Sequence, residues 1–411
     1  MVKVWKSGRK KILLLCWLAY AAAYIGRANL AIALPGMSSS FHWNNAASGI
    51  IGSAFFWAYA IGQLVNGYIG DGFKSRYFIF IGLFMSAAAN FAVGLSSNFS
   101  LTLVLWAFNG FFLSMLWGPI VKTVSAWFPE NKGTRISVIL SLSMIAGYLF
   151  SWGAMGQAIT ALSWRFAFFI PAALLMAYSF VWVAKVRDHP NDVGIKSPAA
   201  YSVKKTGGTQ ENSGLNMREV FIKYRLFLIA VACFVQGFIK DGLSLWAPTF
   251  LKATQNINSS DISLISLVIP IMSMAGILCS GWLNKRFHGN ERRSVLVLFS
   301  CSVIAGIILL ISLGSGIGIT VVLLSIIDAC MYGANTLLLT IIPLKFRAFN
   351  KVSAVAGCLD FCSYIGAASS GVLTGFAADM LGWKSVVASW SILSAIGIVS
   401  LILSKRRAEN I

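Results

Sequence analysis

Long apolar stretches recur along the whole chain, and they constrain its fold more than any other feature. Twelve can be recognised, each about 20 residues or more, enough for a helix to cross the ~30 Å hydrocarbon core of a bilayer. Backbone polar groups in lipid must be paired within the protein, so we predict an all-α membrane protein with twelve transmembrane helices. The predicted spans are residues 12–35, 46–70, 77–96, 100–127, 133–157, 164–184, 226–251, 262–284, 294–313, 317–343, 352–379 and 384–403.

The charge content supports this fold class and explains an unusual net charge. Only 11% of residues are charged, against about 25% in soluble domains. The net charge of +20 could suggest a nucleic-acid partner, but Lys and Arg gather in alternate loops and at both termini. The opposite loops hold only Arg165, Lys252 and Lys384. This asymmetry predicts a multi-pass protein of the cytoplasmic (inner) membrane with both termini in the cytoplasm. We therefore expect the lipid bilayer, and no nucleic acid, as a partner.

The second half of the chain repeats features of the first. Arg27 precedes Pro35 by eight residues, and Lys240 precedes Pro248 by the same interval. The two cations are 213 positions apart. A fixed offset between matching features indicates an internal repeat.

This repeat predicts the domain organisation. We expect six-helix bundles at residues 1–184 and 225–411, pseudo-symmetric and joined by a cytoplasmic linker loop at residues 185–224. Parallel halves related by an axis along the membrane normal are the plan of the major facilitator superfamily, whose substrate site lies near the midplane between the halves.

Two cations lie within apolar spans at matched positions of the repeat, and they indicate the kind of ligand. Placing Arg27 or Lys240 at a helix centre costs about 2.5–3.5 kcal/mol, so such residues usually face a partner or a watery cavity. If the symmetry brings the two cations together, they repel unless an anion lies between them. A guanidinium binds phosphate through paired hydrogen bonds, so the pattern predicts a site for a multiply charged anion.

The alternative is that buried carboxylates neutralise these cations. The candidates are Asp241, Asp328 and Asp360. Asp241 directly follows Lys240, and adjacent side chains on a helix diverge by about 100°, so we expect them to pair poorly. Asp328 is also a candidate substrate ligand, whereas Asp241 and Asp360 are candidates for ion pairing or proton coupling.

Other polar side chains share helix faces with these charges. One stripe in the first span is formed by Tyr20, Tyr24 and Arg27. In the seventh span, Gln236 precedes Lys240 by one turn. In the tenth span, Tyr332 follows Asp328 by one turn. Tyr364 lies one turn after Asp360. Tyrosine stripes in membrane helices often serve packing, so this alternative stays open.

The loop after the second span is a candidate gate. Asp71 and Arg76 match part of the G-x-x-x-D-R-x-G-R pattern that the superfamily carries there, with Gly67 also in place. We expect Asp71 and Arg76 to act in gating between the halves, although a simple positive-inside loop would also explain the cations.

The usual signatures of enzymes and metal proteins are missing from the sequence. The three histidines lie in predicted loops, no CxxC pair occurs, and there is no GxxxxGK motif for ATP. We therefore expect no metal, no cofactor and no enzymatic activity.

Several motifs resemble those of the organophosphate:phosphate antiporters, a family of glycerol-phosphate and sugar-phosphate carriers. These are YIGRANLAIALP in the first span, FNGFFLSMLWGPIVKT in the fourth, VRDHPNDVG after the sixth, WAPTFL in the seventh and SYIGA with DMLGW near the eleventh. The resemblance extends over nearly the full length.

The resemblance implies that Arg27 and Lys240 hold a phosphoryl group, with Tyr20, Tyr24 and Trp117 nearby. The chain departs from the family in having Lys240 where arginine is usual, and Gln63 where the glycerol-phosphate carriers have lysine. The predicted pocket is less cationic, which leaves the particular ester open.

Three functions follow from these features. The first is a monomeric antiporter that exchanges an organic phosphate for inorganic phosphate by alternating access. The second is a proton-coupled symporter of an organic anion such as a sugar acid, with Asp328 or Asp360 carrying the proton. The third is a sugar-phosphate sensor with a transporter fold.

Overall fold

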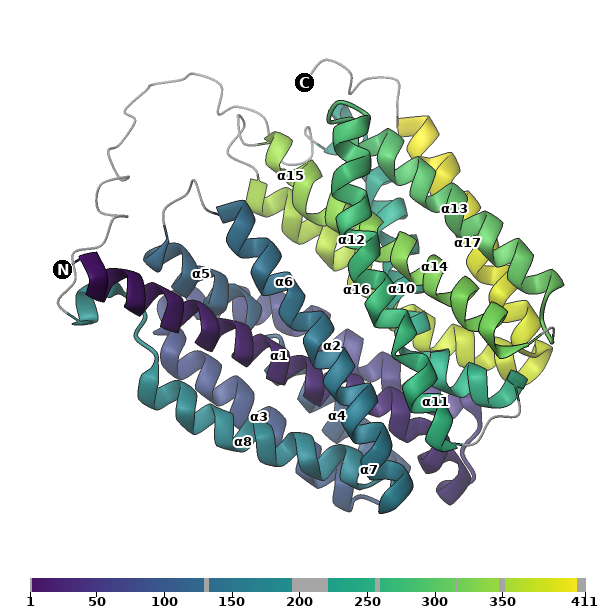
Figure 1. Cartoon of the computed structure of the whole chain (residues 1–411), viewed down its shortest axis with the longest axis horizontal. Helices are drawn as coiled ribbons and strands as arrows, with labels where there is room; N and C mark the ends of the chain where they lie inside the picture. Colours follow the sequence, from purple (N-terminus) through teal and green to yellow (C-terminus); the bar gives the residue numbers. More distant parts are fainter. Residues whose placement is uncertain are drawn as a thin grey trace. The chain divides into compact units, whose positions relative to one another are not determined.

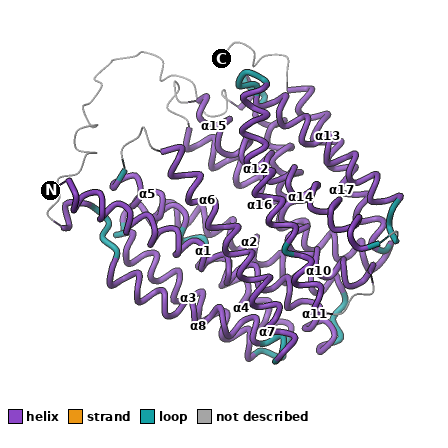
Figure 2. The backbone as a smooth tube through the Cα atoms, in the orientation of Figure 1, coloured by secondary structure: helices purple, strands orange, loops and turns teal. Residues whose placement is uncertain are grey.

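The structure is a computed structural model that describes residues 2–128, 133–193, 221–255, 259–314, 316–346 and 352–404. Within these ranges the regular elements are helical (Figures 1 and 2). In the first half they are α1 (Val2–Phe41), α2 (Asn45–Gly72), α3 (Ser75–Leu95), α4 (Phe99–Leu113), α5 (Trp117–Trp127), α6 (Gly133–Phe150), the π-helix η2 (Ser151–Met155), α7 (Gly156–Ala161), α8 (Phe166–Lys185) and the 3₁₀-helix η3 (Pro190–Val193). In the second half they are α10 (Leu226–Gln255), α11 (Ser259–Ser266), α12 (Val268–Arg286), α13 (Glu291–Ile311), α14 (Ile317–Thr336), the π-helix η5 (Leu337–Ile341), α15 (Ile342–Leu344), α16 (Val352–Leu381) and α17 (Trp383–Leu403).

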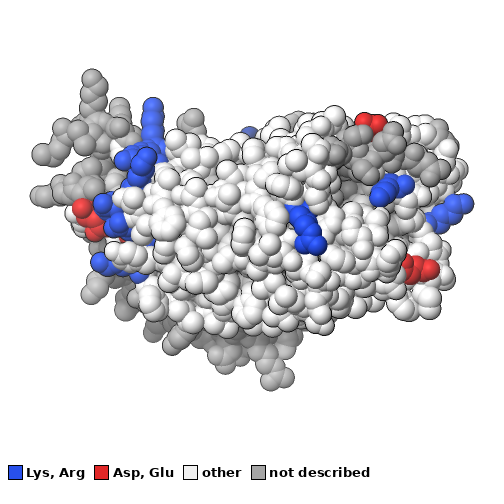
Figure 3. Space-filling model, turned by 90° about the horizontal axis from the view of Figure 1, so that it is seen from below, with Lys and Arg blue, Asp and Glu red and all other residues white. Residues whose placement is uncertain are grey.

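Twelve helical segments within the described ranges are long and apolar enough to span a membrane. Each overlaps one of the twelve predicted spans, so the predicted fold class is confirmed on this point. Large apolar side chains such as Leu278, Trp282 and Ile311 are exposed on these helices. Residues other than Lys, Arg, Asp and Glu form most of the face in Figure 3, as expected for a surface in contact with lipid.

Four spans are less regular than the sequence predicts. The eighth, predicted at residues 262–284, divides at Leu267 into α11 and α12. The span predicted at residues 100–127 divides at residues 114–116 into α4 and α5. Pro119 explains the break, because it has no N–H to bond to the carbonyl group of Met115 and its ring clashes with that carbonyl. The fifth and tenth spans contain the π-helices η2 and η5. In the tenth span, Pro343 follows η5 and cannot donate to the carbonyl group of Leu339.

Contacts between residues divide the chain into two compact units. Unit 1 comprises Met1–Ala33 and Trp57–Gly208, and unit 2 comprises Leu34–Phe56 and Thr209–Ile411. Two of the three boundaries between them fall inside helices, one in α1 and one in α2, and the third, between Gly208 and Thr209, lies outside the described ranges. The predicted division at residues 185–224 stays a prediction, because most of that segment lies outside the described ranges.

Unit 1 is built around α3, which packs along α4 and α8 (Figure 1). The Asn98 side chain begins α4 by accepting a hydrogen bond from the Leu101 N–H at 3.2 Å, since asparagine is a favoured N-cap. Within the core, the rings of Trp106 and Phe168 meet edge to face at 5.8 Å. The contact between Trp106 and Phe168 joins α4 to α8.

Unit 2 relies on very close helix packing. The helix α10 lies along α16, and α12 lies along α14 (Figure 1). A Cβ atom added to Gly237 would fall 2.0 Å from the Ser363 carbonyl oxygen, and one added to Gly276 would fall 2.1 Å from the Ala329 carbonyl oxygen. Small residues allow such backbone contact in membrane helices.

The start of α2 is fastened to α16 within unit 2. The Asp379 carboxylate accepts hydrogen bonds from the N–H groups of Asn45 (3.2 Å) and Ala46 (2.7 Å). An acidic side chain at this position satisfies unpaired N–H groups and complements the helix dipole. One turn further along, a Cβ atom on Gly49 would fall 2.0 Å from the Gly371 carbonyl oxygen. The first turns of α2 are therefore held by both hydrogen bonds and contact.

Candidate functional site

Buried amide side chains fix the position of α1 within unit 1. The Asn29 Nδ2 atom donates to Asn90 Oδ1 and to the Ala167 carbonyl oxygen, each at 2.8 Å. The Asn109 Nδ2 atom donates to the Gly26 carbonyl oxygen at 2.9 Å. Asn29, Asn90 and Asn109 are fully buried. We call this group, with Ser86, the amide cluster; it holds the stretch around Arg27 against α3, α4 and α8.

Arg27 lies among aromatic rings in the same unit. Its Cζ atom is 5.1 Å from the ring centroid of Tyr24 and 5.7 Å from that of Tyr59. The ring of Tyr20 contacts Tyr24 at 5.2 Å and Trp117 at 4.7 Å. Arg27 is 8% exposed. The structure thus brings together four residues that the sequence nominated: Arg27, Tyr20, Tyr24 and Trp117. Aromatic faces attract a guanidinium while leaving its N–H edge available to bind an anion.

Two neighbours of this site were not predicted. Tyr59 lies under the guanidinium of Arg27, and the Tyr148 ring packs at 5.5 Å from that of Tyr24. Tyr148 reaches Tyr24 because Gly147 allows α6 to approach α1: a Cβ atom there would fall 2.7 Å from the Ala21 carbonyl oxygen. The glycine directly before an aromatic residue was the available sequence signal.

Lys240 is the corresponding cation of unit 2, and it is paired with a carboxylate. Its Nζ atom lies 3.2 Å from Asp241 Oδ2 and 5.4 Å from the ring centroid of Tyr332. The expectation that Lys240 and Asp241 pair poorly is therefore wrong. The lysine side chain is long enough to curl along the helix to its neighbour, so the divergence of the two Cβ directions does not decide the contact. Any anion that binds Lys240 competes with Asp241.

Asp328 is buried close to this ion pair. It is 2% exposed, and the fields of both Lys240 and Asp241 reach its carboxylate. One carboxylate oxygen, Oδ2, accepts a short hydrogen bond from the Ser273 hydroxyl group on α12. The other, Oδ1, is buried and has no hydrogen-bond partner. Ser273 is a further residue that the sequence analysis missed.

Gln236, one turn before Lys240, has a buried side-chain N–H group without a hydrogen-bond partner. Its Oε1 atom accepts a hydrogen bond from the Ser363 hydroxyl group at 3.1 Å, whereas its buried Nε2 atom has no hydrogen-bond partner. Residues four apart on a helix have neighbouring Cβ atoms, so the Gln236 and Lys240 side chains leave α10 from the same face. A ligand oxygen near Lys240 could accept a hydrogen bond from Gln236.

The remaining candidates are less informative. Gln63 on α2 and Asp360 and Tyr364 on α16 are half-buried. Asp71 lies in α2, but its side chain is outside the described part of the structure. The roles predicted for these residues stay predictions.

Arg76 is held within unit 1. Its backbone N–H donates to Asp188 Oδ1 at 2.8 Å, and its Nε atom donates to the Val183 carbonyl oxygen. The Trp182 indole N–H donates to the Arg76 carbonyl oxygen at 3.0 Å. Burial raises the pKa of Asp188, against the lowering effect of the Arg76 N–H. The VRDHPNDVG motif thus fastens the start of α3 to the end of α8; these contacts leave the gating prediction untested.

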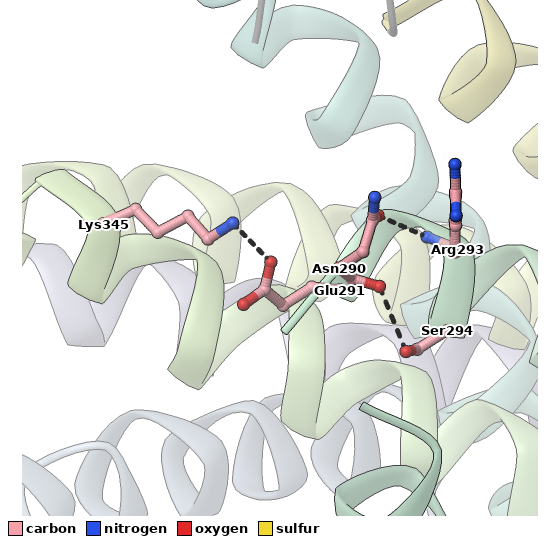
Figure 4. A network of polar contacts seen from close by, with 5 residues as sticks. All are labelled: Asn290, Glu291, Arg293, Ser294 and Lys345. Atoms are coloured by element: carbon pink, nitrogen blue, oxygen red, sulfur yellow. Dashed lines mark hydrogen bonds and ion pairs between the residues drawn. The ribbon is translucent and has the colours of Figure 1, made fainter. Parts of the chain in front are cut away.

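A second ion pair lies in unit 2 between helix ends. Lys345 Nζ is 2.6 Å from the carboxylate of Glu291, the first residue of α13 (Figure 4). The neighbouring Asn290 caps α13 by accepting from the Arg293 N–H at 3.0 Å (Figure 4). The Lys345 side chain is 42% exposed, so this pair is far more solvated than that of Lys240.

The two interior cations belong to different units. Arg27 and its aromatic neighbours are in unit 1, whereas Lys240, Asp241, Asp328 and Gln236 are in unit 2. The predicted joint binding of one anion by Arg27 and Lys240 therefore stays a prediction.

Twelve apolar spans with buried cations define the class as a polytopic membrane transport protein, not an enzyme. The chain belongs to the Major Facilitator Superfamily, whose family model matches residues 16–360. This confirms the superfamily and the fold class predicted from the sequence.

Individual relatives agree with the predicted resemblance to organophosphate carriers. The chain is 25% identical to the "Probable hexose phosphate transport protein" of Chlamydia trachomatis serovar D, over 98% of this chain and 91% of the relative. It is also 25% identical to the "Glycerol-3-phosphate transporter" of Bacillus subtilis, over 100% and 96% of the two chains. A bacterial homologue of the human lysosomal transporter Spinster shares the fold, with a TM-score of 0.78, 14% identity and 97% of each chain covered.

Proposed function

We propose that the protein carries an organic phosphate ester across the cytoplasmic membrane in exchange for inorganic phosphate, by alternating access. The observation that carries this proposal is the pair of buried cations, Arg27 and Lys240, each in a spanning helix eight residues before a proline within that helix. The names of the hexose phosphate and glycerol-3-phosphate relatives support a phosphorylated substrate.

The surroundings of Arg27 and Lys240 favour different interactions with a phosphoryl group. The planar guanidinium of Arg27 can bind two phosphoryl oxygens at once, and Tyr24 and Tyr59 restrict its orientation. Lys240 supplies a point charge, and the open amide of Gln236 supplies a hydrogen bond on the same helix face. Together these groups can bind a phosphoryl group, while the rest of the substrate contacts aromatic surface.

Exchange follows from the energetic cost of an empty site. Without an anion, Lys240 is held by Asp241, and closure of the site must bury the charge of the Arg27 guanidinium in a low-dielectric interior with no phosphoryl group beside it. A phosphate or phosphate ester removes that penalty, so the loaded protein changes state more readily than the empty one. In this proposal Asp241 holds Lys240 between substrates and gives way to the incoming anion.

The experiment is counterflow of labelled phosphate in proteoliposomes. We expect uptake into vesicles preloaded with phosphate, competition by sugar phosphates and glycerol phosphate, and a loss of at least about 100-fold for Arg27→Ala. Arg27→Lys keeps the charge but loses the bidentate geometry and should retain partial activity. Lys384→Ala is the matched control, because that cation is exposed at the start of α17. Undiminished counterflow in Arg27→Ala would refute the proposed site.

The two alternative functions give different results in the same vesicles. A proton-coupled symporter of an organic anion would accumulate substrate without internal phosphate and lose that uptake when the proton gradient is dissipated. A sensor would bind sugar phosphate without counterflow.

The predicted topology and assembly complete the proposal. We infer that both termini face the cytoplasm and that the working unit is a monomer. Reporter fusions at residues 1 and 411 should be active only in the cytoplasm, and the reconstituted protein should exchange phosphate at one copy per vesicle.

A further inference from the structure

The membrane interior of unit 2 contains more acid than base around Lys240. Lys240 pairs with Asp241, and its Nζ atom lies 5.4 Å from the ring centroid of Tyr332, one turn of α14 after Asp328. Lys240, Asp241 and Asp328 are each 9% exposed or less. If both carboxylates were ionised, this group would carry one uncompensated negative charge. Isolated charge is strongly disfavoured in a membrane interior unless a counter-charge or water is present.

The two oxygens of Asp328 differ in a way that indicates where a proton binds. Oδ2 accepts the hydrogen bond from Ser273, and Oδ1 is buried without a hydrogen-bond partner. An ionised carboxylate can accept several hydrogen bonds, so an open, buried oxygen is costly in that state. A protonated carboxyl group keeps the Ser273 contact and carries no charge.

The helices packed against α14 contribute few other groups that could titrate. Lys240 and Asp241 reach Asp328 from α10, and Ser273 reaches it from α12. Tyr332 on α14 lies beside the Lys240 ammonium. The helices α12, α13 and α14 also carry the free thiols of Cys279, Cys301 and Cys330.

A second observation points to a ligand on the same side of α10. The Gln236 Nε2 atom is fully buried and has no hydrogen-bond partner, one turn from Lys240. An unsatisfied buried donor is expected to bind an acceptor, such as an anion oxygen, in another state of the protein.

We propose that Asp328 is a proton-binding site whose occupancy is linked to anion binding at Lys240. An anion that displaces Asp241 adds negative charge beside two carboxylates, so Asp328 keeps its proton to higher pH when the anion is bound, and takes one up from water where it was ionised before. Release of the anion returns that proton. The proposal rests on the proposed function in one respect: the anion binds at Lys240.

The direct test is infrared difference spectroscopy of the purified protein in lipid nanodiscs, titrated with acid and base. We expect a carbonyl band of a protonated carboxylic acid near neutral pH that is lost in Asp328→Asn and kept in the exposed control Asp261→Asn. Ser273→Ala retains the carboxyl group but removes its donor, so its band should persist to higher pH. This second variant tests the site even if Asp328→Asn does not fold.

Calorimetry of inorganic phosphate binding in buffers of different ionisation enthalpy tests the link. At a pH at which the acid band is lost without phosphate, the wild-type protein should take up as much as about one proton more per bound phosphate than Asp328→Asn, and this comparison cancels the titration of phosphate itself. Equal uptake in the two proteins, with phosphate exchange intact, overturns the linkage and leaves the proposed function standing.

The other outcomes are equally decisive. A wild-type protein with no acid band between mildly acid and mildly alkaline pH overturns the proton site. Suppression of the band by sodium ions at constant pH overturns it too, because the site would then bind a metal cation. An Asp328 band in a protein that neither binds nor exchanges phosphate supports the proton site and refutes the proposed function.

Discussion

The two units differ in how they accommodate polar groups away from water. The amide cluster of unit 1 is neutral, and hydrogen bonds link Asn29, Asn90 and Asn109 to one another and to the backbone, although the buried Asn29 Oδ1 atom has no partner. The group around Lys240 in unit 2 is ionisable, and Asp328 and Gln236 each retain an unpaired buried atom. A neutral network fixes one arrangement of helices, whereas a charged group with unpaired atoms can gain partners when a ligand binds.

The two interior cations are therefore positioned in different ways. The amide cluster holds the α1 backbone beside Arg27, so Arg27 is positioned by hydrogen bonds that it does not itself make. Lys240 is positioned by its own counter-ion, Asp241. We therefore expect substitutions in the amide cluster to affect stability first, and substitutions around Lys240 to affect transport as well as stability.

The largest effect is expected for Lys240→Ala. It removes the cation from a buried pair and leaves Asp241 without that partner, which should lower the free energy of unfolding by about 3–5 kcal/mol. Phosphate counterflow should fall at least about 100-fold. The double variant Lys240→Met with Asp241→Leu should recover stability, measured by thermal unfolding, without recovering transport. Recovery of both would contradict the anion-binding role of Lys240.

An intermediate effect is expected for Asn109→Leu. The Gly26 carbonyl oxygen loses a donor, and the Asn90 amide and Ser86 hydroxyl groups lose an acceptor. Each buried group left unpaired costs about 1–3 kcal/mol, so thermal stability should fall clearly. Ser86→Ala, which removes only one donor, should cost less. If the folded Asn109→Leu protein binds phosphate much more weakly than wild type, the amide cluster is more than structural.

A smaller effect is expected at the solvated ion pair. Lys345→Met removes the exposed partner of Glu291, whose own side chain is only 7% exposed. We expect a loss of about 1–3 kcal/mol in unfolding free energy, smaller than that of Lys240→Ala because the lost cation is 42% exposed, and normal phosphate exchange. A loss as large as that of Lys240→Ala would show that burial does not distinguish the two pairs.

The smallest effect concerns Asp188, a carboxylate outside the spanning helices. Burial raises its pKa in the folded protein, so the folded state binds this proton more tightly than the unfolded state. Its contribution to stability therefore decreases as pH rises from the unfolded to the folded pKa. Asp188→Asn keeps an oxygen for the Arg76 N–H and should flatten that slope. An unchanged pH profile of thermal unfolding would contradict this assignment.

Much of the fold could be predicted because membrane spans are local features of sequence. Length and hydropathy alone define the twelve spans, whereas the internal repeat indicated by the matched positions of Arg27 and Lys240 stays a prediction. The break between α4 and α5 and the π-helices η2 and η5 were not predicted. They change the hydrogen-bonding pattern without changing hydropathy, and prolines such as Pro119 and Pro343 were the only local sign.

The sequence predicted which site residues share one helix face, but not which residues of neighbouring helices contact them. The stripe of Tyr20, Tyr24 and Arg27 follows from helical periodicity, and the structure places these side chains in contact. Tyr59, Tyr148 and Ser273 were missed because they come from neighbouring helices, whose register depends on packing at glycines and not on a local pattern. The Lys240–Asp241 pair was missed because a helical-wheel angle ignores the reach of a lysine.

The continuity of α1 and α2 across the boundaries between the units limits how this molecule can move. Rigid bodies joined by loose hinges could swing without internal cost, but here two of the three boundaries fall within α1 and α2, and in α1 Pro35 leaves the Ala31 carbonyl group without its usual donor. We therefore expect a rearrangement of the units to bend α1 near Ala33 and α2 near Phe56. The alternative is that residues 34–56 lose their contacts with α10 and α16. Introducing a proline at either point should therefore act on the rate of turnover and leave equilibrium binding of phosphate unchanged.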